Sequence, residues 1–237
     1  MSNNYFRFKQ FTVYQEHTPM KVGTDGTLLG AWASGGQHIL DVGTGTGLIA
    51  LMMAQRFVEA DVTAIDIDPQ ACKQAAENVK ASPFAERITV HNLSLQDFAA
   101  ATAQRLPYSF DAIVCNPPFF SDSLVSPDFG RTIARHARAL TYDELCHHAW
   151  NLLADNGEFS TIVPVECCER METAAVLAGF HVHRKTSIRT TPSKPPRRIL
   201  LAFGRHSQNL EAAEITINSN DYRRLTADFY LEKHEKM

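Results

Sequence analysis

One apolar run that ends on two prolines decides the fold: Phe110-Asp111-Ala112-Ile113-Val114-Cys115-Asn116-Pro117-Pro118-Phe119. The run is short, continuous and rich in β-formers, which predicts a strand buried on both faces, as in a parallel sheet. Neither proline can donate a ladder hydrogen bond, so the strand ends there. Parallel sheets bind their ligands outside the carboxyl ends of their strands. We therefore expect a ligand site at this turn.

The residues of the turn suit a planar amine. Asn116 has an amide oxygen, the prolines hold backbone carbonyl groups rigidly, and Phe119 supplies a flat aromatic face. Two such acceptors can take both hydrogens of an –NH2 group while the ring stacks on its plane. An ordinary proline turn after a core strand is the alternative interpretation.

A glycine-rich loop upstream favours the functional interpretation. A strand ending at Val42 runs into three glycines, and a helical run from Leu48 to Arg56 follows. The glycines are Gly43, Gly45 and Gly47. Such a loop lets the backbone approach a ligand, to which the next helix presents its positive end. Dinucleotide folds have the spacing Gly-x-Gly-x-x-Gly, whereas this loop has Gly-x-Gly-x-Gly with Asp41 in its mouth. An acid there suits a cationic amino-acid group better than a pyrophosphate.

Further strands alternate with helices along the chain. Asp66 closes the next strand, about 20 residues after the loop, where a carboxylate can accept both ribose hydroxyls. We interpret Asp97, which follows the third strand, as a surface helix residue. The later predicted strands are Glu158–Pro164, Phe180–Thr190 and Arg198–Phe203. This order predicts an α/β sheet that closes with a pair of strands.

The N-terminal region predicts a small cap and a helix. Alternating aromatic and polar residues over Tyr5–Tyr14 indicate a hairpin strand half open to water, within a cap of about 20 residues. Thr24 or Asp25 can cap the helix that follows. If its start lies near a cofactor, its free N–H groups can bind a carboxylate; a capped packing helix is the alternative.

Bulk composition excludes several classes of protein. The length of 237 residues predicts one α/β domain that spans residues 1–237. The net charge of −3 excludes a uniformly basic nucleic-acid binder. The sequence has no run of about 18 apolar residues and no signal-peptide core, so we expect a cytoplasmic protein without a membrane partner. Five cysteines without a Cys-x-x-Cys pair indicate reduced thiols. The pattern of histidines and cysteines predicts no metal site.

Two basic stretches are candidates for phosphate contacts. Arg131, Arg135 and Arg138 would share one helix face, which is either a solvated surface or a phosphate-contact strip. The stiff loop Thr191–Arg197 forms the most basic region of the chain with neighbouring cationic residues. The candidates for an RNA-binding patch are Arg131, Arg135, Arg184, Lys185, Lys194 and Arg197.

The motifs together resemble S-adenosylmethionine-dependent methyltransferases of class I. The glycine loop with Asp41, the acid Asp66 and the Asn116–Phe119 turn resemble that superfamily's cofactor loop, ribose acid and amino-methylating motif, in this order. The narrower stretches Met20–Trp32 and Arg197–Phe203 resemble the bacterial tRNA1(Val) adenine-37 N6-methyltransferase family. The likeness covers nearly the whole chain. Phe119 replaces a tyrosine that is more frequent in the family, which preserves stacking.

The resemblance implies a fold, a reaction and a set of site residues. The fold would be Rossmann-like: a mostly parallel sheet of seven strands with helices on both faces and one antiparallel strand near the C-terminus. The reaction would be S-adenosylmethionine-dependent methylation of adenine 37 in a tRNA bound by its anticodon arm. The implied cofactor residues are Lys21, Thr24, Asp41, Gly43, Gly45, Gly47, Asp66, Ser94 and Asn116, and the implied catalytic residues are Asn116, Pro117 and Phe119. Ser94 stands where the family has the acid that meets the cofactor adenine.

Other functions fit parts of the same pattern. A glutamine amide in a protein, or the guanine amine of ribosomal RNA, would present a similar plane to the Asn116 turn. A nicotinamide-dependent oxidoreductase shares the first half of the fold, but the glycine spacing, Asp41 and the lack of a Tyr-x-x-x-Lys hydride site disfavour it. An RNA-binding module with a vestigial cofactor loop would not need the intact Asn116–Phe119 motif.

Overall fold

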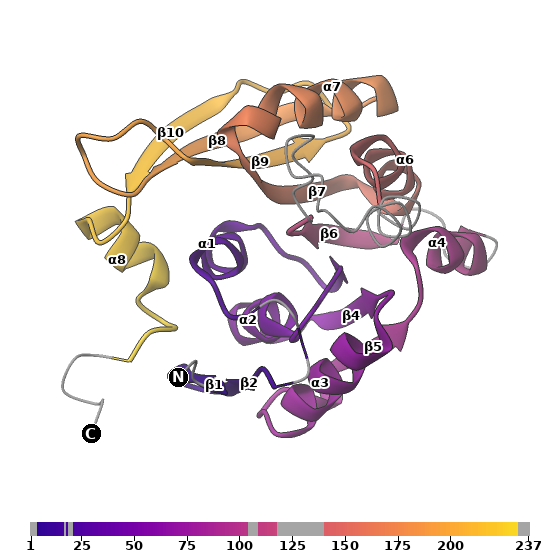
Figure 1. Cartoon of the computed structure of the whole chain (residues 1–237). Coiled ribbons are helices and arrows are strands. Elements are labelled where there is room, and N and C mark those ends of the chain that lie inside the picture. Colours follow the sequence, from indigo (N-terminus) through magenta and orange to yellow (C-terminus); the bar gives the residue numbers. More distant parts are fainter. Residues whose placement is uncertain (1–3, 17, 19–20, 104–108, 118–139, 232–237) are drawn as a thin grey trace, which may run out of the picture.

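The computed structural model describes residues 4–16, 18, 21–103, 109–117 and 140–231, and its main feature is a sheet of eight strands (Figure 1). In spatial order the strands are β10 (Glu211–Thr216), β8 (His181–Arg189), β9 (Arg198–Gly204), β7 (Leu153–Pro164), β6 (Phe110–Cys115), β3 (His38–Val42), β4 (Asp61–Asp66) and β5 (Ile88–Asn92). Strand β9 is antiparallel to both of its neighbours, β7 and β8, and the remaining described neighbours pair in parallel. The mostly parallel sheet with one antiparallel strand is as predicted.

The predicted number of seven strands is wrong by one. The eighth strand, β10, pairs in parallel with β8 at the edge of the sheet, with Glu211 opposite Arg184. Its side chains are mostly exposed, and it has no apolar run or clean alternation that would mark a strand. Pairing with an existing edge, rather than burial, holds it in place.

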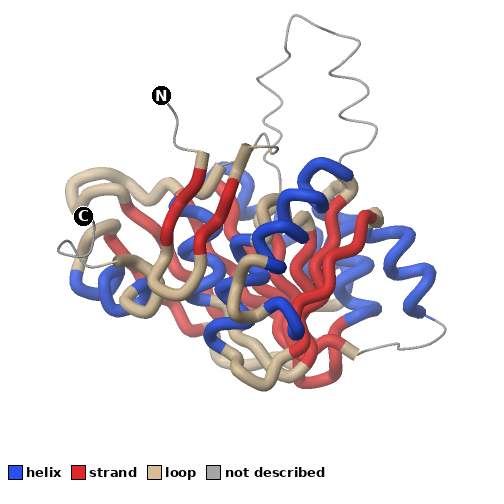
Figure 2. Tube along the Cα trace, turned by 90° about the horizontal axis from the view of Figure 1, so that it is seen from below, coloured by secondary structure: helices blue, strands red, loops and turns tan. Residues whose placement is uncertain are grey.

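Helices cover both faces of the sheet and bury two separate cores (Figures 1 and 2). One face carries α1 (Thr24–Trp32), α2 (Leu48–Arg56), α3 (Pro69–Lys80) and α8 (Asn220–Thr226). The other carries α4 (Leu95–Ala103), α6 (Tyr142–Leu152) and α7 (Cys168–Ala178). Two short 3-10 turns, η1 (Ala85–Arg87) and η2 (Val165–Cys167), precede β5 and α7. Along β6, Ala112 and Val114 enter the first core, whereas Ile113 and Cys115 enter the second. This two-sided burial explains the continuous apolar run.

The first two strands form a hairpin outside the large sheet. β1 (Tyr5–Arg7) pairs antiparallel with β2 (Thr12–Tyr14), and Phe8 and Phe11 next to them are buried in the first core. The hairpin lies beside α3 (Figure 1). Across the described residues, every helix is too short or too polar to cross a lipid bilayer.

Helix ends follow the sequence at α3 but not at α1. Asp68 caps α3 by accepting a hydrogen bond from the Gln70 amide at 2.9 Å, and Pro69 occupies the first helical position. The prediction that Thr24 or Asp25 caps α1 is wrong. Both lie inside the helix, and its N-cap is Gly23, which makes no side-chain capping bond within the described residues. The first amides of α1 therefore lack a side-chain cap.

Candidate active site

The carboxyl ends of β3, β4 and β6 bring the predicted motifs together. In the sheet, Val42 of β3 lies opposite Cys115 of β6 and Ile65 of β4. Gly43 and Asn116 come directly after the paired residues Val42 and Cys115. Because paired strands lie about 4.8 Å apart, the glycine loop and the asparagine turn start side by side.

The glycine loop has a backbone that other residues would adopt only under strain. Gly43, Gly45 and Gly47 all have positive φ, at 71°, 57° and 81°. The amide of Gly43 donates to the Ile65 carbonyl at 2.9 Å, which ties the loop to the end of β4. A Cβ at Gly43 or Gly45 would meet no described atom within 4 Å, whereas one at Gly47 would lie 3.4 Å from Ala75. The loop is therefore open on one side and packed on α3 on the other.

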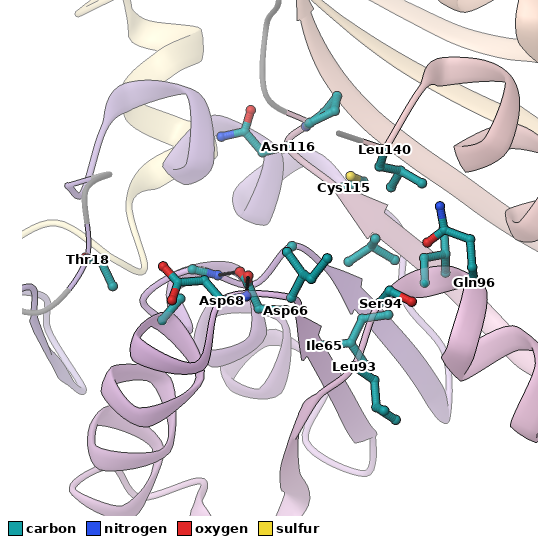
Figure 3. Close-up of a pocket in the computed structure, with 17 residues that line it drawn as sticks. Thr18, Ile65, Asp66, Asp68, Leu93, Ser94, Gln96, Cys115, Asn116 and Leu140 are labelled. Atoms are coloured by element: carbon teal, nitrogen blue, oxygen red, sulfur yellow. Dashed lines mark hydrogen bonds between the residues drawn. The ribbon is translucent and has the colours of Figure 1, made fainter. Parts of the chain in front are cut away.

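Two hollows lie on either side of this loop, and both are lined by Gly43, Gly45 and Asn116. The first hollow also has walls formed by Asp66, Ile67, Leu93, Ser94, Gln96 and Pro117. The second hollow also has walls formed by Lys21, Thr24, Asp25, Thr44, Thr46 and Leu48. In Figure 3, Asn116 lies across the first hollow from Asp66. Ser94 is at one end of the hollow and Thr18 is at the other.

Asp41 lies beneath the loop rather than in its mouth. Its side chain is fully buried, and Oδ2 accepts hydrogen bonds from the Thr44 hydroxyl at 2.6 Å and the Ala50 amide at 3.1 Å. Oδ1 is also buried and has no hydrogen-bond partner among the described residues. Burial raises the pKa of Asp41 from 3.8 to about 7; the two hydrogen bonds oppose this rise, and the charge of Asp66 adds to it. A nearby cation would stabilise the ionised carboxylate.

Asp66 is held at the wall of the first hollow by backbone amides. Oδ2 accepts from the Gly45 amide at 2.8 Å, and Oδ1 accepts from the Asp68 amide at 2.9 Å (Figure 3). Burial raises the pKa of Asp66, and these hydrogen bonds oppose the rise. Each carboxylate oxygen has a second lone pair, so both can still accept hydroxyl protons.

Ser94 and Asp97 act as a pair at the far end of the first hollow. The Ser94 hydroxyl donates to Asp97 Oδ2 at 2.6 Å and accepts from the Asp97 amide at 3.0 Å. Ser94 lines the hollow, whereas Asp97 is exposed in the first turn of α4. The hydroxyl proton of Ser94 points to Asp97, so the hydroxyl can only accept from a ligand.

The second hollow receives the start of α1. Lys21 and Thr24 are exposed and line it. Asp25, in the same wall, forms an ion pair with Arg198 at 2.7 Å, which fastens the first turn of α1 to the start of β9. The uncapped amides of this turn and the Lys21 ammonium suit a carboxylate ligand.

Asn116 has an unused acceptor at the meeting point of both hollows. Its Oδ1 is buried and has no hydrogen-bond partner in the described part of the chain. Pro117 is buried next to it and lines the first hollow. Phe119 lies outside the described residues. A buried amide oxygen without a partner is costly, so this position favours a ligand donor.

Two members of the predicted basic patch form ion pairs in the structure. Arg184 contacts Glu158 at 2.6 Å and stacks on the Trp32 ring at 4.0 Å, and Lys185 contacts Glu172 at 2.8 Å. Both cations are therefore paired with carboxylates of this chain. Lys194 and Arg197 are exposed in the loop between β8 and β9. Arg131 and Arg135 lie outside the described residues.

Several residues that line the first hollow were not predicted from the sequence. Gln96 is two residues after Ser94 in the first turn of α4, and this position after a strand end was the available signal. Thr18, by contrast, reaches the first hollow from the N-terminal region and has no local signature. Among the described residues, no group of three or more His, Cys, Asp or Glu side chains is placed to hold a metal ion.

Comparisons with known proteins identify the family of this chain. A family model described as the methyltransferase small domain matches residues 27–165. A protein of Phocaeicola vulgatus named tRNA1(Val) (adenine(37)-N6)-methyltransferase is 47% identical over 239 residues, which covers 98% of this chain and 99% of that protein. A protein of Trichodesmium erythraeum with the same name is 41% identical over 242 residues, covering 98% and 100%. The chain belongs to the tRNA1(Val) (adenine(37)-N6)-methyltransferase family.

Family membership confirms the prediction that the chain is an S-adenosylmethionine-dependent methyltransferase. Solved structures support the Rossmann-like fold of this methyltransferase. A predicted O-methyltransferase of Agrobacterium tumefaciens has a TM-score of 0.68 at 18% identity, covering 86% of this chain and 96% of that one. The TYW2 protein of Pyrococcus horikoshii, in complex with MeSAdo, has a TM-score of 0.58 at 14% identity, covering 86% and 73%.

Two observations on the described residues favour S-adenosylmethionine as the ligand of this site. S-adenosylmethionine combines a nucleoside with a cationic amino group and a carboxylate. Asp41 Oδ1 is a buried acceptor without a hydrogen-bond partner among the described residues, and a cationic amino group close to it would stabilise its ionised form. The space above Gly43 and Gly45, which a Cβ would occupy, is left open for the ligand.

Proposed function

We propose that this enzyme methylates N6 of adenine 37, the base beside the anticodon, in tRNA1(Val). Two observations carry the proposal. Relatives of that name match 98% of the chain at 41–47% identity, and the Asn116 turn that resembles their amino-methylating motif lines the same hollows as the glycine loop. An amine held at the turn and a methyl donor held at the loop would therefore lie next to each other.

The first hollow suits the adenosine part of the cofactor. Asp66 would accept the ribose hydroxyls with its remaining lone pairs, and Ser94 would accept a hydrogen bond from the adenine amine. Ile67 and Leu93 offer apolar walls for the base; they are 57% and 37% exposed, so a bound base would cover them. When bound, S-adenosylmethionine supplies an activated methyl group on a sulfonium sulfur.

The second hollow suits the methionine part. Asp41 would hold the amino group from beneath the loop through Oδ1. Lys21, Thr24 and the uncapped start of α1 would hold the carboxylate. Gly43 and Gly45 line both hollows, so the two parts of one ligand can join across the loop.

Asn116 and Pro117 would orient the target amine. Asn116 Oδ1 and the Pro117 carbonyl each accept one amine hydrogen. These bonds oppose conjugation of the nitrogen with the ring, so the nitrogen lone pair is freed and directed at the methyl group. A base splayed out of the anticodon loop would stack on Phe119, which is worth roughly 1–3 kcal/mol. The excess proton can pass to water after transfer, so positioning is the main contribution of the protein.

Nucleoside analysis of tRNA tests the proposed substrate. Mass spectrometry of tRNA1(Val) from cells that lack the protein should show unmodified adenine 37, and the purified enzyme should restore the methyl group. Transfer of labelled methyl groups to cell extract, with and without ribonuclease, separates the alternatives. Label that survives ribonuclease would indicate protein glutamine, and label in ribosomal guanine would indicate the other RNA acceptor.

The loop that carries Lys194 lies at the same end of the strands as the candidate site. The loop of residues 190–197 joins the carboxyl end of β8 to the start of β9, where Arg198 pairs with Pro164 at the carboxyl end of β7. Lys194 is exposed, and it lies at the same end of the sheet as Asn116, where the parallel strands have their carboxyl ends. We propose that Lys194 and Arg197 contact phosphates of the anticodon arm.

Charge reversal at Lys194 should weaken tRNA binding alone. We expect Lys194→Glu to raise the Kd for tRNA roughly tenfold and to lower its salt slope by about one, with an unchanged Kd for S-adenosylhomocysteine. Filter binding at several salt concentrations measures both. The matched control is Lys80→Glu. Lys80 is exposed in the last turn of α3, at the opposite end of the sheet, where the parallel strands have their amino ends. Equal weakening by both variants would contradict a local contact.

Cofactor binding should depend on pH through Asp41. Its pKa of about 7 in the free protein must fall when a cationic amino group approaches, so binding below that pH releases a proton. We expect the affinity for S-adenosylhomocysteine to fall about tenfold per unit as the pH drops below about 7. Calorimetry in buffers of different ionisation enthalpy detects the released proton. An Asp41→Asn variant should show no release, and release in that variant would assign the proton elsewhere.

The same pKa affects the stability of the free protein. Because burial raises the pKa of Asp41 from 3.8 to about 7, its protonated form favours the folded state. This contribution to the free energy of unfolding is fully present below the pKa that Asp41 has in the unfolded chain, and it is lost as the pH rises through about 7.

We also propose a cytoplasmic location, since all five cysteines carry free, buried thiols that suit a reducing compartment.

A further inference from the structure

Buried amide side chains on α3 hold the N-terminal arm, here defined as the described residues from Tyr14 to Gly23. Gln74 and Asn78 are both buried, and they lie one turn apart on the same face of the helix. Gln74 Oε1 accepts from the Glu16 amide at 3.0 Å. Asn78 Oδ1 accepts from the Tyr14 amide at 2.9 Å, and its Nδ2 donates to the Tyr14 carbonyl at 2.8 Å.

The two contacts on the helix are spaced by nearly the same distance as the two contacts on the extended arm. Residues four apart on a helix rise about 6 Å, and residues two apart on a strand rise about 6.6 Å. Gln74 and Asn78 can thus each bond an extended backbone at Glu16 and Tyr14 without distortion. The carboxamide of Asn78 bonds both the N–H and the C=O of Tyr14, as a neighbouring strand would.

Asn78 differs from Gln74 in a second contact, to the glycine loop. Its Nδ2 also donates to the Thr46 carbonyl at 2.8 Å. Thr46 lies between Gly45 and Gly47, and Gly47 packs against Ala75 of the same helix. One buried amide therefore bonds both the arm and the loop, with its two donors and its acceptor all used.

Both bonded segments carry walls of the proposed cofactor site. The arm brings Thr18 to the first hollow and Lys21 to the second, and the Val22 amide is fastened to Gln15 Oε1 at 2.7 Å. The loop brings Gly43 and Gly45 to both. Asn78 itself lines neither hollow as far as the described residues extend.

We propose that Asn78 is a positioning residue for cofactor binding, which holds the N-terminal arm and the glycine loop at the separation that the cofactor requires. The inference rests on the cofactor placement proposed above. The cofactor would touch the arm and the loop but not Asn78. Loss of the shared amide would let the two walls move independently while the methyl-transfer geometry at Asn116 stays unchanged in the bound complex.

Asn78→Asp is the sharpest test, because it keeps the size and the acceptor but removes both donors. We expect its Kd for S-adenosylhomocysteine to rise roughly ten- to a hundredfold, with kcat at saturating cofactor within about threefold of the parent. Hydrogen exchange should quicken in peptides that span residues 43–47 as well as in the arm. Asn78→Ser, which is uncharged and too short to reach Thr46, should change the same quantities in the same direction if Asn78→Asp does not fold.

Gln74→Glu is the matched control on the same helix face. It makes the same amide-to-acid change and keeps the acceptor for Glu16, and the Gln74 amide nitrogen donates to Glu77 of the same helix at 3.4 Å. Its Kd for S-adenosylhomocysteine should stay within about threefold of the parent, with unchanged exchange over residues 43–47. Equal losses in the Gln74 and Asn78 variants, or parent-like affinity in the Asn78 variants, would overturn the positioning role.

Hydrogen exchange of the parent protein distinguishes a failure of the Asn78 positioning role from a failure of the proposed cofactor placement. If S-adenosylhomocysteine binds the parent but protects neither residues 43–47 nor the arm from exchange, the proposed cofactor placement is wrong. If it protects both, and the Asn78 variants bind as the parent does, only the positioning role is wrong.

Discussion

Replacing Asn116 with alanine should abolish methyl transfer and leave cofactor binding almost unchanged. We expect kcat to fall by roughly 10³-fold or more, because the variant loses the acceptor that orients the amine and frees its lone pair. The Kd for S-adenosylhomocysteine should change by no more than about threefold, since the loop, Asp41 and Asp66 remain in place. Transfer of labelled methyl groups to unmodified tRNA, together with calorimetry, measures both quantities.

A second asparagine provides the control for this variant. Asn151 is exposed near the end of α6, where its side chain contacts His147 at 3.3 Å. Asn151→Ala makes the same chemical change away from the hollows and should keep full activity. If Asn116→Ala lost cofactor affinity in proportion to its turnover, Asn116 would be part of the cofactor site rather than the residue that orients the amine.

Adding one methyl group at Gly45 should nearly eliminate cofactor binding. Gly45→Ala places a Cβ where no described atom lies within 4 Å, on a loop that forms both hollows. The added methyl group would occupy space that we assign to the cofactor, so we expect the Kd for S-adenosylhomocysteine to rise by roughly a hundredfold. The positive φ of 57° adds a strain of about 1–2 kcal/mol to the folded state.

The variant Gly47→Ala distinguishes the effect of backbone strain from the effect of filling the space assigned to the cofactor. Gly47 has a φ of 81°, so alanine is strained there too, but its Cβ would face Ala75 of α3 rather than the hollows. Both variants should lower the Tm by a few degrees, at about 2–4 °C per kcal/mol for a chain of this size. Only Gly45→Ala should also lose the cofactor. Similar affinities in the two variants would show that the open side of the loop does not receive the ligand.

Much of the sheet could be predicted because its signals are local. The run Phe110–Cys115 is apolar on both faces, and each face enters a separate core. The glycines of the cofactor loop need positive φ, which few other residues tolerate. The structure adds that β3 and β6 are parallel neighbours, which brings Gly43 and Asn116 together.

The remaining features depend on contacts between distant residues. β10 is a strand only because the edge of β8 is available to it. Arg184 pairs across the folded sheet with Glu158, 26 residues earlier in the chain, and no local pattern indicates this pair. Asn78 appears in the sequence as an ordinary helix residue, and its bonds to Tyr14 and Thr46 connect segments 64 and 32 residues away. Such pairings leave no periodic pattern in the sequence.

The position of β9 has a consequence for synthesis on the ribosome. β9 is nearly the last strand made, yet it lies between β7 and β8, and Leu200 to Phe203 are completely buried there. Until residue 204 has left the exit tunnel, the nascent chain carries an unpaired β7 edge above an exposed apolar surface. Chaperones that shield such edges should therefore matter most during the last stage of translation, and a message truncated before this strand would yield an aggregation-prone product.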